Sequence, residues 1–191
     1  MRRLTALAAL GVVVLGGSLV SGAAGELVAP DKPTVSTDTP VWTDEQNATF
    51  VLSGSQNTAS FICRLDSGAA GWGSCTSPVS YPSLTEGGHT FQVRALDASG
   101  NQSPPATFSW TVDVTAPVLP GNVTVEATSP VGAIVSFAAT DNRDPSPGLA
   151  CTHAPGSTFP LGNTDVTCTA TDAAGNASAG VVRVAGRDTT P

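Results

Sequence analysis

A turn motif and a linker aspartate each occur twice in this chain, at the same spacing. The motif Asp-Ala-Ser-Gly-Asn begins at Asp97, and Asp-Ala-Ala-Gly-Asn begins at Asp172, 75 residues later. Asp113, in the linker after the first motif, likewise lies 75 residues before Asp188. This period is long for a helical solenoid repeat and suits a compact β-sandwich of about seven strands. The repeat therefore predicts related domains in tandem.

Short segments with alternating apolar and polar residues predict the strands of these domains. In residues 90–95 the apolar side chains are Phe91, Val93 and Ala95, so one face of the strand would enter a core. Glycine in the two repeated motifs permits positive φ, and their Asp and Asn side chains can bond turn amides, which predicts hairpin turns. We predict an all-β chain of two immunoglobulin-like β-sandwiches. The segments expected as strands include 49–53, 61–65, 90–95, 107–112, 123–125, 135–137, 166–170 and 181–184.

The amino terminus has the pattern of a secretory signal. Arg2 and Arg3 precede an apolar run at 4–20, and small residues follow at 21–25. A spanning helix needs ~20 apolar residues, so this run is short for a membrane anchor. We expect a cleaved signal peptide at 1–25, a secreted or cell-surface protein, and a membrane encounter only during export.

The boundaries of the remaining chain follow from the repeated linker. We expect an immunoglobulin-like domain at 26–113, a second one at 114–185, and the start of a further linker at 186–191. Such a linker indicates that the natural protein continues or that this chain is a truncated product. The net charge is −7, and it becomes −9 when Arg2 and Arg3 leave with the signal peptide. The few remaining basic residues are scattered, which disfavours phosphate contacts and a nucleic-acid partner.

Four cysteines follow the export signal, and an even number in an exported chain indicates disulfides. Three pairings are possible, of which the local loops Cys63–Cys75 and Cys151–Cys168 are the simplest. The wide spacings fit no familiar zinc pattern.

Several segments of the second predicted domain follow, in order and spacing, the pattern of one known family: Asn122–Pro130, Ala139–Pro145, Cys151, Gly156–Gly162 and Val166–Asn176. With these segments the domain resembles the hyalin repeat (HYR) domain, an extracellular immunoglobulin-like module linked to adhesion. The resemblance implies that Cys151 pairs with Cys168, although the cysteine that many relatives carry before Asn122 is missing.

The first predicted domain, residues 30–113, also contains segments with a family pattern: Ala48–Gly54, Ser60–Asp66, Cys75–Pro78 and Gly88–Asp97. With these segments it resembles the immunoglobulin-like repeats of bacterial surface proteins. Neither resemblance brings a catalytic motif to transfer.

The residues themselves do not suggest an enzyme. His89 is expected on the surface at the start of a strand, and His153 in a loop or short strand. No Gly-x-Ser-x-Gly motif accompanies them, and cysteines in disulfides are not nucleophiles. We therefore expect a non-enzymatic extracellular spacer or adhesion element. The alternative is a glycan- or protein-binding accessory module of a larger secreted hydrolase; the partner, an extracellular protein or glycan, is unidentified.

Two features are candidate binding sites. Asp113, Asp141, Asn142 and Asp144 offer oxygens that could hold Ca²⁺ at the domain junction, against the alternative of ordinary turn capping in a solvated acidic loop. Hairpin turns alternate between the ends of a sandwich, which would separate Asp97 from Asp113. Trp72, between two glycines, could stack on a sugar or insert into a partner, or it could fold over the sandwich edge.

Overall fold

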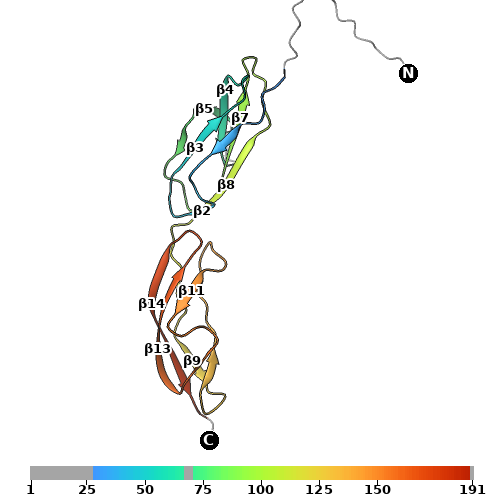
Figure 1. Ribbon diagram of the computed structural model, residues 1–191. Helices are drawn as coiled ribbons and strands as arrows, with labels where there is room; N and C mark the ends of the chain where they lie inside the picture. Colours follow the sequence, from blue (N-terminus) through green and yellow to red (C-terminus); the bar gives the residue numbers. More distant parts are fainter. Residues whose placement is uncertain (1–27, 67–70, 190–191) are drawn as a thin grey trace, which may run out of the picture.

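A computed structural model describes residues 28–66 and 71–189 of the chain (Figure 1). The predicted signal peptide at 1–25 lies outside the described residues, as do the last two residues of the predicted further linker. The described residues form fourteen strands and no helix, which confirms the predicted all-β class. Accordingly, none of the described segments is a helix able to cross a membrane. Figure 1 shows two elongated β units end to end; we call β1–β8 the N-terminal sandwich and β9–β14 the C-terminal sandwich.

The N-terminal sandwich consists of a three-stranded sheet, in the order β1-β3-β6, and a five-stranded sheet, in the order β2-β8-β7-β4-β5. The central pairs β7–β8 and β4–β7 are antiparallel. Its strands are β1 (Thr34–Ser36), β2 (Trp42–Thr43), β3 (Ala48–Ser53), β4 (Ser60–Leu65), β5 (Gly73–Cys75), β6 (Val79–Tyr81), β7 (Gly87–Leu96) and β8 (Ala106–Val112).

Aromatic side chains from both sheets fill the N-terminal core. Phe50 on β3 stacks on Phe91 of β7, with ring centroids 4.3 Å apart and planes 7° apart. Trp110 on β8 lies 5.4 Å from Phe50. Each of these rings is buried, and polar neighbours along the same strands face outward, as period-2 alternation predicts. Burial of these large apolar surfaces holds the two sheets together.

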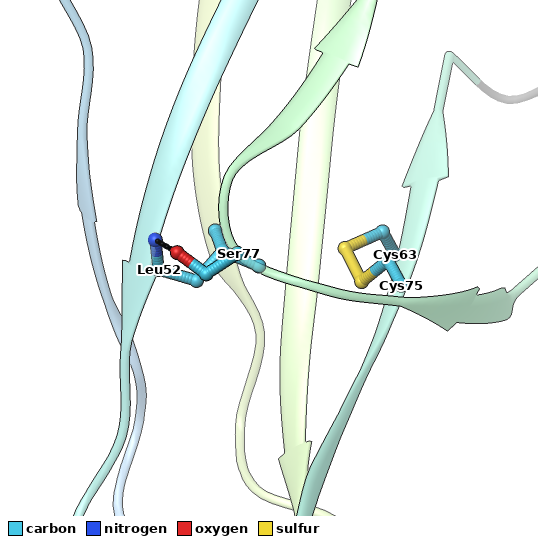
Figure 2. Close-up of a disulfide and its surroundings, with 4 residues drawn as sticks. All are labelled: Leu52, Cys63, Cys75 and Ser77. Atoms are coloured by element: carbon cyan, nitrogen blue, oxygen red, sulfur yellow. Dashed lines mark hydrogen bonds between the residues drawn. A yellow bond between two sulfur atoms is a disulfide. The ribbon is translucent and has the colours of Figure 1, made fainter.

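A disulfide anchors the edge of the five-stranded sheet. Cys63 of β4 bonds to Cys75 of β5, which is the edge strand (Figure 2). Immediately afterwards the chain crosses to the other sheet, where the Ser77 hydroxyl accepts a 2.8 Å hydrogen bond from the backbone amide of Leu52 on β3. The bridge and this bond together fix the crossing between the sheets.

The C-terminal sandwich has a four-stranded sheet, β11-β13-β14-β9, and a two-stranded sheet, β10-β12. The disulfide Cys151–Cys168 joins β11 to β13 at directly paired positions. The core of the C-terminal sandwich is aliphatic around Phe159, with Val135, Val166, Val182 and Val184 buried. Its strands are β9 (Val123–Glu126), β10 (Ala133–Val135), β11 (Gly148–Cys151), β12 (Ser157–Phe159), β13 (Gly162–Thr171) and β14 (Ala177–Arg187).

One predicted strand is displaced. The alternation at 135–137 predicts a strand there, whereas β10 ends at Val135. Val135 is the last residue to pair with β12, and its carbonyl oxygen accepts a hydrogen bond from the Gly156 amide where the chain turns into β12. The apolar residue that suggests continuation, Phe137, instead packs partly buried against the C-terminal core.

The two repeated motifs form matching turns. The Asp97 carboxylate accepts hydrogen bonds from the backbone amide and the side-chain amide of Asn101, at 2.8 and 2.7 Å. Asp172 does the same with Asn176, at 2.8 Å for both bonds. Gly100 and Gly175 have φ of 87° and 99°, which glycine adopts without a steric penalty. The sequence repeat therefore corresponds to a repeated local structure.

Candidate functional site at the junction

The segment after β8 is bonded to both sandwiches. The backbone amide of Asp113 donates to the carbonyl oxygen of Thr43, 2.9 Å away in the N-terminal sandwich. The Asp113 carbonyl oxygen accepts a 2.8 Å bond from the Asn176 side chain of the C-terminal sandwich. Farther along, Pro117 accepts a 2.5 Å bond from the hydroxyl of Ser178 on β14. These bonds hold the connecting segment in one path.

Glu86 links the N-terminal sandwich to the linker and to the loop at 141–144. Its carboxylate accepts hydrogen bonds from the hydroxyl of Thr115, at 2.9 Å, and from the side-chain amide of Asn142. Arg143 completes the group, with its Nε 3.4 Å from a Glu86 oxygen. The hydrogen bond from Asn142, followed by that from Thr115, lowers the pKa of Glu86, so Glu86 is held as an anion facing these donors.

Three carboxylates meet beside this contact. Asp113 comes from the end of β8, Asp141 from the loop before β11, and Asp172 from the turn between β13 and β14. One oxygen from each lies within 4.8 Å of the other two. The three residues are far apart in sequence, and the docking of the two sandwiches brings Asp113 to the other two.

Backbone amides orient each carboxylate through one oxygen. Asp113 Oδ1 accepts from the amide of Thr115, at 3.1 Å, and Asp141 Oδ1 accepts from the amides of Arg143 and Asp144, both at 2.8 Å. The Oδ2 atoms of Asp113 and Asp141 are buried and have no hydrogen-bond partner. A buried polar atom without a partner costs free energy, so these two oxygens are prepared to accept a donor or a cation.

Asp113 is the most enclosed member of the group, with 0% of its surface exposed. Burial raises the pKa of its carboxyl, and the negative charges of Asp141, Asp172 and Glu86 raise it further, against the amide bond from Thr115. Both effects penalise the anion. No basic side chain is within ion-pairing distance of Asp113 in the described part of the chain.

The structure brings together two of the four residues that the sequence suggested as Ca²⁺ ligands. Asp113 and Asp141 belong to the three-carboxylate group. Asn142 instead bonds Glu86, and both oxygens of Asp144 accept backbone amides, from Ser146 and Ala173. Asp172 takes their place in the group. Its signal in the sequence was the repeated turn motif, but only the docked arrangement puts that turn beside Asp113.

The other singled-out residues lie away from the junction carboxylates. Trp72 folds over the sheet, with the guanidinium carbons of Arg64 and Arg94 at 4.8 and 5.0 Å from its ring centroid. This is cation–π distance, so the half-buried ring is already in contact with its own chain. His153 is exposed, with its ring 5.7 Å from that of Phe159.

The prediction of a surface position for His89 was wrong. The ring is buried, with Nδ1 3.0 Å from Asp66 Oδ2 and Nε2 2.7 Å from the carbonyl oxygen of Thr85. His89 falls in phase with Phe91 on the inward face of β7, and its two ring nitrogens are satisfied by Asp66 and by the carbonyl oxygen of Thr85. Among the described residues no nucleophile is bonded to the ring, and its partners Asp66 and Thr85 hold it in place.

Part of this chain matches a known protein family. Residues 112–185 match the HYR domain family, which confirms the predicted resemblance of the second domain. No curated protein matches the chain. Among solved structures, the fibronectin(III)-like modules of Clostridium thermocellum CbhA are 13% identical over 81% of this chain and 95% of that chain, with a TM-score of 0.40. The N-terminal eight Ig domains of Down Syndrome Cell Adhesion Molecule are 13% identical over 81% of this chain and 25% of that chain, with a TM-score of 0.42.

Proposed function

We propose that the chain, whose residues 112–185 match the HYR domain family, is a non-enzymatic extracellular spacer. In this role it holds other parts of a secreted or surface protein at a set distance and orientation. The observation that carries the proposal is Glu86, which binds the linker through Thr115 and the C-terminal sandwich through Asn142 and Arg143. A freely jointed pair of domains would have no such contact.

The shape of the chain supports this role. The described residues begin at the outer end of the N-terminal sandwich and finish at the outer end of the C-terminal one, so length accumulates along one axis (Figure 1). The two hydrophobic cores share no residue, and the bonds that Glu86 and Asn176 make across the junction are polar. Two disulfides fit an oxidising compartment outside the cytosol.

The test is whether the two sandwiches tumble as one body. ¹⁵N relaxation of the purified chain should give the same rotational correlation time for both sandwiches. Glu86→Ala removes the acceptor shared by Thr115, Asn142 and Arg143, and should shorten and separate the two times. Glu126→Ala, which removes an acceptor of Thr189 at the far end of the C-terminal sandwich, is the control and should leave them equal. Unequal correlation times in the unsubstituted chain would contradict the spacer proposal.

The alternative role, a glycan-binding accessory module, requires a different structural feature. It needs an exposed aromatic platform, and Trp72 is the candidate because single aromatic rings bind sugars by stacking. Since Arg64 and Arg94 already face that ring, the structure supports the spacer more strongly. Binding of the chain on a glycan array, lost on Trp72→Ala, would favour the alternative role.

A further inference from the structure

We propose that Asp113, Asp141 and Asp172 bind one Ca²⁺ ion between the two sandwiches. The ion would be shared: one ligand comes from the end of the N-terminal sandwich and two come from loops of the C-terminal sandwich. Its role as a stiffener of the junction rests on the spacer function proposed above, whereas its binding does not.

The geometry fits a cation of this size. Three oxygens no more than 4.8 Å apart can all lie within about 2.8 Å of a common centre, and Ca–O distances are ~2.3–2.6 Å. Small movements of the side chains would therefore complete the contacts. The amides that hold Oδ1 of Asp113 and of Asp141 fix these carboxylates before any ion arrives, so little ordering entropy remains to be lost on binding.

An acidic cluster alone would not indicate a ligand, because carboxylates gather in turns for other reasons. Here Asp113 is fully enclosed, and its Oδ2 has no hydrogen-bond partner. Asp141 Oδ2 is a second buried oxygen without one. A bound cation would provide the missing partner to both oxygens and cancel the repulsion among three carboxylates. It would thereby remove two separate costs of the docked arrangement.

The donor set favours Ca²⁺ over other ions. All three ligands are hard carboxylate oxygens, and no histidine or cysteine belongs to the group, which disfavours zinc and copper. Ca²⁺ accepts six to eight oxygens in flexible geometry, so three carboxylates and added waters suffice. Mg²⁺ needs near-ideal octahedral geometry at shorter distances of ~2.0–2.1 Å, which these separately anchored carboxylates do not offer.

The experiment is a calorimetric titration of the full chain with CaCl₂, with scanning calorimetry at each end point. We expect a dissociation constant between about 10⁻⁵ and 10⁻³ M, which extends from the weakest sensor sites to extracellular calcium sites. We expect the melting temperature of the less stable sandwich to rise by at least about 5 °C in 10 mM Ca²⁺. MgCl₂ and NaCl at matched ionic strength control for screening of the like charges.

Two variants test the ligands, and the repeat supplies a matched control. Asp141→Asn and Asp172→Asn keep an oxygen for the turn amides and should weaken Ca²⁺ binding at least about tenfold, because affinity follows the number of charged ligands. Asp97→Asn makes the same change in the equivalent turn at the other end of the N-terminal sandwich. It should cost stability as Asp172→Asn does, while Ca²⁺ binding stays unchanged.

The outcomes separate this site from the spacer proposal. Absence of binding heat and of a melting shift in 10 mM Ca²⁺ overturns the site, and so does an equal response to Mg²⁺ or Na⁺. Equal loss of binding in Asp97→Asn and Asp172→Asn also overturns it. If Ca²⁺ binds as expected but ¹⁵N relaxation still shows separate correlation times, the site stands and the spacer function fails.

Discussion

The side-chain amide of Asn176 donates a 2.8 Å hydrogen bond to the backbone carbonyl oxygen of Asp113, across the junction between the sandwiches. Its second hydrogen goes to the Asp172 carboxylate within its own turn. Asn101, at the same position of the first turn, bonds only Asp97 among the contacts of the described residues. The same turn motif therefore closes a hairpin in both sandwiches. In the C-terminal sandwich this turn also contacts the end of the N-terminal sandwich.

This difference predicts that replacing the turn asparagine by alanine affects the junction in the C-terminal sandwich but not in the N-terminal one. Asn101→Ala and Asn176→Ala each remove the bond to the turn aspartate, and each should lower the free energy of unfolding of its own sandwich by about 1 kcal/mol. Only Asn176→Ala should also loosen the junction and separate the ¹⁵N correlation times. Equal correlation times in that variant would show that the bond to Asp113 does not hold the sandwiches together.

Removing the charge of Asp113 should stabilise the folded protein, whereas most substitutions of buried residues destabilise it. Asp113→Asn keeps an oxygen for the Thr115 amide and replaces an unpartnered buried oxygen with a donor facing two carboxylates. Without divalent cations, in EDTA, we expect the variant to be more stable than the unsubstituted chain by about 1 kcal/mol. Chemical denaturation measures the difference. A destabilised variant would show that the charge on Asp113 is already compensated in the folded protein.

Glu86 predicts how acid affects the junction. Hydrogen bonds from Asn142 and Thr115 lower its pKa in the folded protein. A lowered pKa means that the stabilisation is complete above the ordinary pKa of glutamate and is lost as pH falls through the lowered value. The amide resonances of Thr115 and Arg143 should therefore shift together in strongly acidic solution. Glu86→Gln should abolish this common transition, and its persistence in that variant would assign it to another carboxylate.

Much of this fold could be predicted from local patterns. Alternation located the strands because a two-residue period sends every second side chain into a core, and it even contained the signal for buried His89, which is in phase with Phe91. The turns were predictable because Asp, Gly and Asn act within five residues. Two members of the three-carboxylate group, Asp113 and Asp141, could be predicted from the sequence, and Asp172 could not. Contact between Asp113 and Asp172 depends on how one sandwich docks on the other, and no short-range pattern contains that information.

The disulfides predict separate losses of stability in the two sandwiches. Cys151 and Cys168 are 17 residues apart and Cys63 and Cys75 are 12 apart, so each bridge should contribute about 3 kcal/mol by restricting the unfolded chain. Replacing Cys151 and Cys168 together by alanine should lower only the melting temperature of the C-terminal sandwich. Peptide mapping without reduction should find both local pairs, and a peptide linking the two sandwiches would contradict this pairing.

The separate cores predict that damage to one sandwich leaves the other folded. Phe50 is fully buried and stacks on Phe91, so Phe50→Ala should lower the free energy of unfolding of the N-terminal sandwich by about 3–5 kcal/mol through lost burial and a cavity. Phe159 is equally buried in the other core, shares no neighbour with Phe50, and provides the reciprocal substitution. Scanning calorimetry should show one transition moving in each variant while the other stays in place. These junction hydrogen bonds lie mostly at the surface. Their loss should therefore change the free energy of unfolding of the other sandwich by less than about 1 kcal/mol. A single transition that falls as a whole in both variants would mean that the sandwiches fold as one cooperative unit, and the division of the chain at the linker would then be wrong.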